Sequence, residues 1–84
     1  MPDRSDLKRA AAWRLDGARH GLNLTMQDFT DRYGISYGQA LDIVAKRSFP
    51  SLATRTLIEA IRLDPDLIAR AAALARGHYG PPLK

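Results

Sequence analysis

The sequence predicts an all-α domain, and three observations favour that fold class. Two polar pairs, Thr25 with Asp28 and Ser36 with Gln39, have the spacing of helix N-caps, in which a hydroxyl accepts a backbone N–H of the first turn. Apolar residues elsewhere recur at intervals of three and four, which is the period of one helical face. No segment shows the alternation of apolar and polar residues that is typical of a half-buried strand.

The first helix is predicted over residues 6–20, with Asp3 or Ser5 as its N-cap and with Gly21 and Asn23 closing it. Its apolar face consists of Leu7, Ala11, Leu15, Ala18 and Leu22. This face is expected to pack against the rest of the domain.

Two short helices are predicted over residues 26–32 and 37–44, joined by a turn that contains Gly34. Glycine adopts the left-handed conformation without steric cost, so Gly34 is expected to end the first of them sharply. The short connection forces the two helices to cross at a steep angle. The residues expected to face inward are Phe29, Tyr33, Ile35, Ala40 and Ile43.

A fourth and a fifth helix are predicted after the loop 46–50. Ser51 can cap the fourth, whose apolar residues are Leu52, Leu57, Ala60 and Ile61. Asp64 followed by Pro65 is a cap followed by the residue best tolerated in a first helical turn, so a fifth helix is expected to run to Arg76 and to end at Gly77. The expected organisation is one domain over residues 1–76 and a Pro- and Gly-containing tail over 77–84.

Composition limits the function. With 84 residues and 45% hydrophobic content, the chain can form one small core but no deep catalytic cleft. It has no cysteine, and His20 and His78 are too far apart in sequence to suggest a metal site. No nucleophile, base and orienting acid can be assembled, so we expect no enzyme activity, catalytic residue, metal or cofactor. No apolar run is long enough to span a bilayer and no signal peptide is evident, so a cytoplasmic protein is expected.

The layout of residues 7–68 resembles the lambda-repressor-like, Cro-like helix-turn-helix family of phage, plasmid and bacterial repressors, whose fold is a compact five-helix domain. The resemblance rests on Gln27, Phe29, the turn Gly34, Ile35 and Ser36, then Ala40, Ile43, Pro50 and Ser51. Three positions depart from the family pattern. Thr30 stands where alanine is most common, Val44 where a glutamate often pairs with an arginine of the first helix (here Arg19), and Lys46 where glycine is usual.

The resemblance implies that the exposed side of the second motif helix reads DNA bases, through Ser36, Tyr37, Gly38, Gln39 and Asp42. A glutamine amide can pair with adenine, tyrosine can contact a thymine methyl group, and a carboxylate can accept from cytosine. Gly38 costs the helix about 1 kcal/mol relative to alanine. Either its backbone closely approaches a partner, or it is a poorly optimised surface position.

Phosphate contacts are predicted at Gln27, Arg32, Lys46, Arg47 and Arg55. The net charge of +4 agrees with a polyanionic partner but is weak support by itself. The alternative is a rim of solvated charges, which we favour for Arg32 and Arg55, whereas the phosphate role is favoured for Lys46 and Arg47.

The fifth helix is apolar on more than one side, which predicts a homodimer contact through Leu67, Ile68, Ala71, Ala72, Leu74 and Ala75. Trp13 lies off the apolar face of the first helix and is expected at the edge of the core, with a dimer contact as the alternative. The function predicted is that of a dimeric, sequence-specific repressor on a palindromic operator in double-stranded DNA, with a protein co-regulator as a further partner. The alternative is a protein-interaction module of the same fold, such as an antitoxin-like inhibitor or adaptor.

Overall fold

The computed structural model describes residues 4–79, and within that range it contains five α-helices and no strand. The helices are α1 (Arg4–Gly21), α2 (Met26–Tyr33), α3 (Tyr37–Val44), α4 (Leu52–Leu63) and α5 (Pro65–Tyr79). The predicted all-α class is confirmed. None of the described helices is long and apolar enough to cross a membrane.

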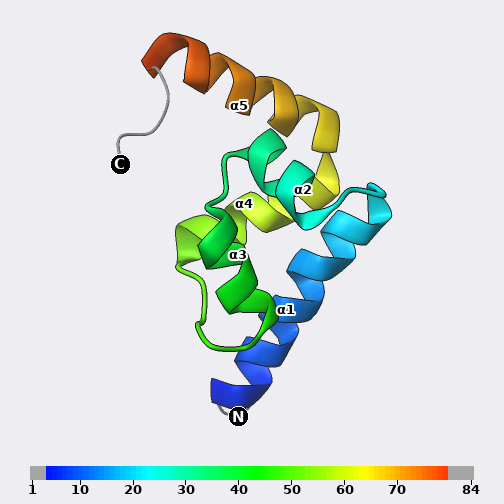
Figure 1. The fold of residues 1–84 in the computed structure, drawn as a ribbon, viewed down its shortest axis with the longest axis vertical. Coiled ribbons are helices and arrows are strands. Elements are labelled where there is room, and N and C mark those ends of the chain that lie inside the picture. The colour runs from blue at the N-terminus through cyan, green and yellow to red at the C-terminus, as the bar shows by residue number, and fades with distance from the viewer. Residues whose placement is uncertain (1–3, 80–84) are drawn as a thin grey trace.

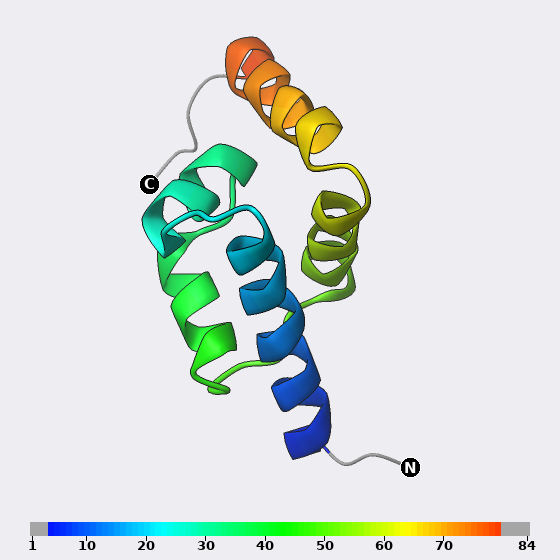
Figure 2. The same cartoon turned by 90° about the vertical axis from the view of Figure 1, so that its right-hand side faces the viewer.

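The helix α1 is the centre of the arrangement. Figure 2 shows it between α3 and α4, and it packs against both. Helix α2 packs on α3, while α5 crosses the far end of the molecule and contacts α2 and α4 (Figure 1). Helix α3 is therefore supported from behind by α1 and α2.

The core lies where α1, α2, α3 and α4 meet, and its members recur at the predicted helical spacing. All five residues expected to face inward from α2, α3 and their connection are buried, which confirms that prediction. Each fully buried large side chain contributes roughly 1.5–3 kcal/mol relative to exposure. The core consists of Ala11, Leu15, Ala18, Phe29, Tyr33, Ile35, Ala40, Ile43, Ile58 and Ile61.

Two expectations about the ends of helices were wrong. Ser5 lies inside α1, which already begins at Arg4, so it is not the N-cap; Asp3 lies outside the described residues. Gly77 does not end α5, because its backbone stays helical and the helix continues to Tyr79. A glycine ends a helix only where the chain takes up its left-handed conformation, and Gly77 does not.

Some apolar side chains expected in the core are exposed instead. Leu7 is 41% exposed because the first turns of α1 project beyond the neighbouring helices (Figure 2). Leu52 is 68% exposed at the start of α4. Trp13 is 78% exposed, so its expected place at the edge of the core was wrong.

Candidate nucleic-acid interface

Helices α2 and α3 start with the side-chain caps that the sequence predicts. The Thr25 hydroxyl accepts from the Asp28 backbone N–H at 3.1 Å, and the Ser36 hydroxyl accepts from the Gln39 backbone N–H at 3.2 Å. Between them Gly34 adopts φ 73°, the left-handed conformation expected of it. Because both starts and the turn are fixed by backbone hydrogen bonds, α3 has a defined orientation on α2.

Packing beneath α3 holds it in place. Ala40 and Ile43 are fully buried on its inner side, and the Phe29 and Tyr33 rings of α2 lie with centroids 5.3 Å apart. Thr30 is also buried, and its hydroxyl donates to the carbonyl oxygens of Met26 and Gln27 at 2.9 and 3.0 Å. The extra hydroxyl at this position is therefore satisfied within its own helix, and α2 and α3 remain packed together.

The outer side of α3 is open to solvent, including all five predicted base-reading positions apart from the half-buried Asp42. Ser36 uses its hydroxyl as the helix cap, whereas Tyr37 is 43% exposed in the first turn. Leu41 is 38% exposed on this side and was not predicted as a site residue. The sequence could have indicated Leu41, because it lies one helical turn after Tyr37 and therefore on the same side of the helix.

Gly38 lies in open space. A methyl group added there would meet only the Ser36 hydroxyl oxygen, at 4.0 Å, and the backbone conformation is ordinary helix. Nothing within the described part of the protein therefore requires glycine at this position. Any requirement for a small residue would have to come from a binding partner.

Gln39, the simplest predicted base reader, points to the start of α4. Its side-chain amide donates to the Thr54 hydroxyl at 3.3 Å, and that hydroxyl also accepts from the Ser51 hydroxyl at 3.2 Å. Ser51 in turn caps α4 by accepting from the Thr54 backbone N–H at 3.2 Å. This polar link between α3 and α4 was not predicted from the sequence.

Two consecutive cations follow the end of α3. Lys46 adopts the left-handed conformation with φ 64°, and its N–H donates to the Ile43 carbonyl at 3.0 Å. The next N–H, of Arg47, donates to the Asp42 carbonyl at 2.8 Å, which completes a Schellman-type helix end. The Arg47 guanidinium also binds the Asp42 carboxylate at 2.9 Å. A predicted phosphate contact and a predicted base reader are thus paired with each other.

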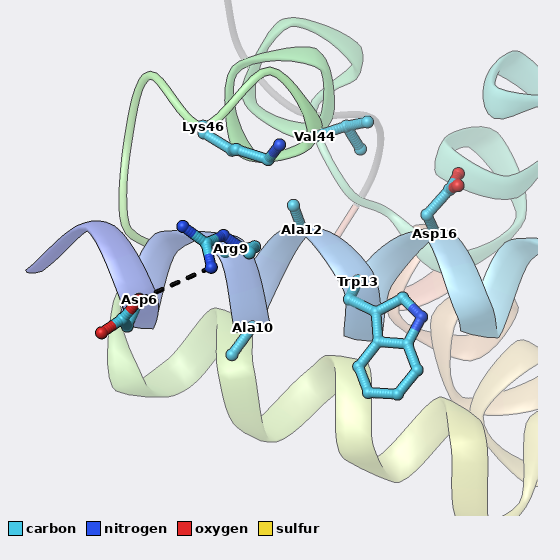
Figure 3. Close-up of a pocket in the computed structure, with 8 residues that line it drawn as sticks. All are labelled: Asp6, Arg9, Ala10, Ala12, Trp13, Asp16, Val44 and Lys46. Atoms are coloured by element: carbon cyan, nitrogen blue, oxygen red, sulfur yellow. Dashed lines mark ion pairs between the residues drawn. The ribbon is translucent and has the colours of Figure 1, made fainter. Parts of the chain in front are cut away.

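Lys46 extends over α1. Figure 3 shows its side chain above Arg9 and Ala12, on the border of a hollow of ≈ 560 Å³ between α1 and the end of α3. The other residues that line this hollow are Asp6, Ala10, Trp13, Asp16 and Val44. Arg9 forms an ion pair with Asp6 at 3.6 Å, so this hollow is lined by charges of both signs.

The remaining predicted phosphate contacts are placed less favourably. The Gln27 amide donates to the Asp31 carboxylate at 3.0 Å, and Arg32 is exposed in the last turn of α2. Arg55 lies over the Phe49 ring at 4.7 Å and donates to the Pro50 carbonyl at 3.2 Å. Its contacts stabilise the loop before α4, which favours a structural role over phosphate binding.

Arg19 also has partners within the chain. Its guanidinium donates to the Asp16 carboxylate at 2.9 Å and to the Leu24 carbonyl at 2.9 Å. Asp16 therefore supplies the charge that a glutamate at position 44 would supply in the family pattern, and Val44 leaves no uncompensated cation.

The predicted dimer residues divide between two sides of α5. Ile68 and Ala72 are partly buried, and Ile68 packs against the core. On the opposite side Leu67 is 48% and Leu74 is 62% exposed, beside a hollow of ≈ 520 Å³ that Arg70, Ala71 and Ala73 also line. Ala75 is exposed as well.

Helix α5 is tied to α2 by two hydrogen bonds. The Tyr33 hydroxyl donates to the Pro65 carbonyl at 3.3 Å, and Arg76 donates to the Asp31 carbonyl. The apolar outer side of α5 is consequently held in a fixed position relative to α2 and α3.

Comparison of the chain with protein-family models, with curated proteins and with solved structures gave no significant match.

Proposed function

We propose that this protein is a sequence-specific, DNA-binding transcriptional repressor of the helix-turn-helix type, acting in the cytoplasm as a homodimer on a palindromic operator. The observation that carries the proposal is the exposed side of α3, which ends at the cations Lys46 and Arg47. An α-helix fits the major groove of DNA, and cations at its end can neutralise the flanking phosphates.

The residues on α3 suit base reading in different ways. Gly38 has open space around it, so the helix backbone can approach the floor of the groove closely. Leu41 and Tyr37 offer apolar surface to thymine methyl groups, while the Asp42 carboxylate can accept from the amino group of cytosine. Gln39 can pair with adenine by turning its amide away from Thr54, because the bond that it would exchange is long, at 3.3 Å.

A dimer would supply the second half of the recognition site. One such domain has a small footprint, and two copies related by a two-fold axis read two half-sites about one helical turn apart. The exposed apolar side of α5, around Leu67 and Leu74, is the surface that we assign to this contact.

Selection of bound duplexes from a random DNA library at near-physiological salt tests the proposal. Enrichment of an inverted repeat is the expected result, since each correctly read base pair contributes about 1–3 kcal/mol. Absence of any enriched sequence, with only weak salt-sensitive binding, would refute it. The alternative function, a protein-interaction module with no specific DNA binding, would then be favoured.

Arg47→Ala, compared with Arg62→Ala, sharpens this test. Both arginines are exposed and ion-paired, Arg47 with Asp42 and Arg62 with Glu59, but only Arg47 follows α3. We expect Arg47→Ala to weaken binding to all duplexes alike and to lower the salt slope by about 1, and Arg62→Ala to leave both unchanged at the same low protein concentration.

A further inference from the structure

The outer side of α1 carries an exposed tryptophan that the proposed DNA contact does not use. Trp13 is 78% exposed, whereas Leu15, nearly opposite on the same helix, is fully buried. Tryptophan is among the residues most enriched at the centres of protein interfaces, because its ring offers a large apolar area with few rotatable bonds. This exposed ring is therefore a candidate for the centre of a contact surface.

Trp13 belongs to a regular row of exposed residues. The row, called here the outer α1 stripe, consists of Asp6, Ala10, Trp13, Gly17 and His20, all of them exposed. Their successive spacings of four, three, four and three residues are the repeat by which two helices pack along each other. The small residues Ala10 and Gly17 leave room on either side of the indole.

The stripe adjoins one end of the candidate DNA interface. Asp6, Ala10 and Trp13 border the same hollow as Lys46 and Val44, although Figure 3 shows the two sets of side chains directed to different sides of α1. The exposed side of α3 itself, with Tyr37 and Leu41, contributes no residue to this hollow. On its α4 side, Trp13 borders a shallow hollow of ≈ 330 Å³ that an indole from a partner could enter.

We propose that the outer α1 stripe binds the same stripe of a second copy of this chain, with the two α1 helices antiparallel. A two-fold axis near the position of Trp13 exchanges residues that lie at equal or nearly equal distances on either side of it. Ala10 then faces Gly17 of the second copy, so that two small residues meet. Asp6, which is paired with Arg9 of its own chain at 3.6 Å, faces His20 of the second copy, which lies 3.3 Å from the Asp16 carboxylate of its own chain, so that two acid–base pairs meet.

The flanking charges agree with the same arrangement. Arg9 and Asp16 lie on the same flank of the stripe, at nearly equal distances before and after Trp13. The two-fold axis brings Arg9 beside Asp16 of the second copy. This charge complementarity between copies favours a second copy over an unrelated partner as the occupant.

The contact is independent of the α5 dimer in the proposed function. If both form, the α1 contact joins neighbouring dimers, and such dimers would occupy adjacent operators cooperatively. If the α5 contact fails, the α1 contact still gives a dimer. The two faces can therefore be tested separately.

The protein supplies its own probe, because Trp13 is the only tryptophan in the chain. Its fluorescence is measured while the protein concentration is raised, with sedimentation velocity on the same samples. We expect the emission maximum to shift to shorter wavelength as the mass rises, because pairing buries the indole. An emission maximum that stays at the exposed position while the protein associates, or no association at all, would overturn the proposal.

Charge variants test the antiparallel register. Asp6→Lys should raise the dissociation constant for this step at least about tenfold, because a cation would then face His20 of the second copy. Adding His20→Glu should restore most of the association. The control Leu74→Asp, on α5, should leave the fluorescence shift in place. Unchanged association in Asp6→Lys, with the helical content intact, would overturn the register.

Discussion

The ends of α2 and α3 share a left-handed residue and a closing hydrogen bond, but they are made of different residues. At the end of α2 the Ile35 N–H donates to the Thr30 carbonyl at 3.0 Å, and at the end of α3 the Arg47 N–H donates to the Asp42 carbonyl at 2.8 Å. The residue before each donor is left-handed, with φ 73° at Gly34 and φ 64° at Lys46. Both helices therefore close with the 6→1 hydrogen bond of a Schellman motif, although the Gly34 N–H donates to the Thr30 carbonyl and the Lys46 N–H donates to the Ile43 carbonyl.

The residues that fill the two motifs serve different purposes. After α2, glycine takes the left-handed position and the next residue, Ile35, is buried in the core. After α3, lysine takes that position and the next residue, Arg47, is exposed and ion-paired. A left-handed side chain costs about 1–2 kcal/mol. The end of α2 thus carries residues that stabilise the fold, whereas the end of α3 carries two cations although Lys46 is strained.

The end of α1 provides a reference for this difference. Asn23 is left-handed there with φ 57°, and the Leu24 N–H donates to the Arg19 carbonyl at 3.3 Å. Asparagine and glycine are the residues that tolerate this conformation best. Among the three left-handed helix ends in the described residues, Lys46 is thus the one that is neither glycine nor asparagine.

The largest difference is expected at the two residues that follow the left-handed positions. Ile35→Ala should lower the free energy of unfolding by about 2–4 kcal/mol, because it leaves a cavity in the core. Arg47→Ala should lower it by less than about 1 kcal/mol, because an exposed ion pair contributes little. Urea denaturation followed by circular dichroism measures both. Equal losses in the two variants would show that the motifs have equivalent structural roles.

A smaller loss is expected at the left-handed glycine. Gly34→Ala should destabilise the protein by about 1 kcal/mol or more, because alanine is strained at this backbone conformation. No atom beyond the two neighbouring residues lies within 4 Å of the added methyl group, so the loss of stability reports the strain of the backbone conformation. Gly17→Ala is the matched control, since Gly17 also has no atom within 4 Å of an added methyl group but lies inside α1, where alanine stabilises a helix by about 1 kcal/mol. A Gly34→Ala variant as stable as the wild type would contradict this account.

The reverse substitution at the end of α3 should have the opposite sign. Lys46→Gly should raise the free energy of unfolding by about 0.5–1 kcal/mol, because it relieves strain while adding freedom to the unfolded chain. On the proposed function it should also weaken DNA binding. Lys46→Ala removes the same charge and keeps the strain, so it should weaken DNA binding without stabilising the protein. If Lys46→Gly bound DNA as tightly as the wild type, DNA binding would not explain why a lysine occupies this strained position.

The sequence predicted the helices well and the contacts on the surface poorly. The hydroxyl caps and Gly34 determine the ends of α2 and α3 through local hydrogen bonds, so the range of α3 was predicted correctly, and that of α2 to within one residue. The Asp42 pair with Arg47 and the Gln39 bond to Thr54 depend on how the loop returns the chain to α4. Such contacts leave no pattern in the neighbouring sequence from which they could be predicted.

The smallest effect on stability is expected at Asp42, which pairs with Arg47 and is also a proposed base-reading residue. Asp42→Asn removes the charge that holds Arg47, at a stability cost of about 0.5 kcal/mol, because the pair is exposed to solvent. It also removes an acid from the surface that we assign to DNA, so binding to a scrambled duplex should tighten at low salt. Binding to the selected operator should gain less, because asparagine cannot replace the carboxylate as an acceptor for cytosine. The ratio of the two affinities, measured by fluorescence anisotropy, should therefore fall. An unchanged ratio would remove Asp42 from the base-reading residues and leave it the role of positioning Arg47.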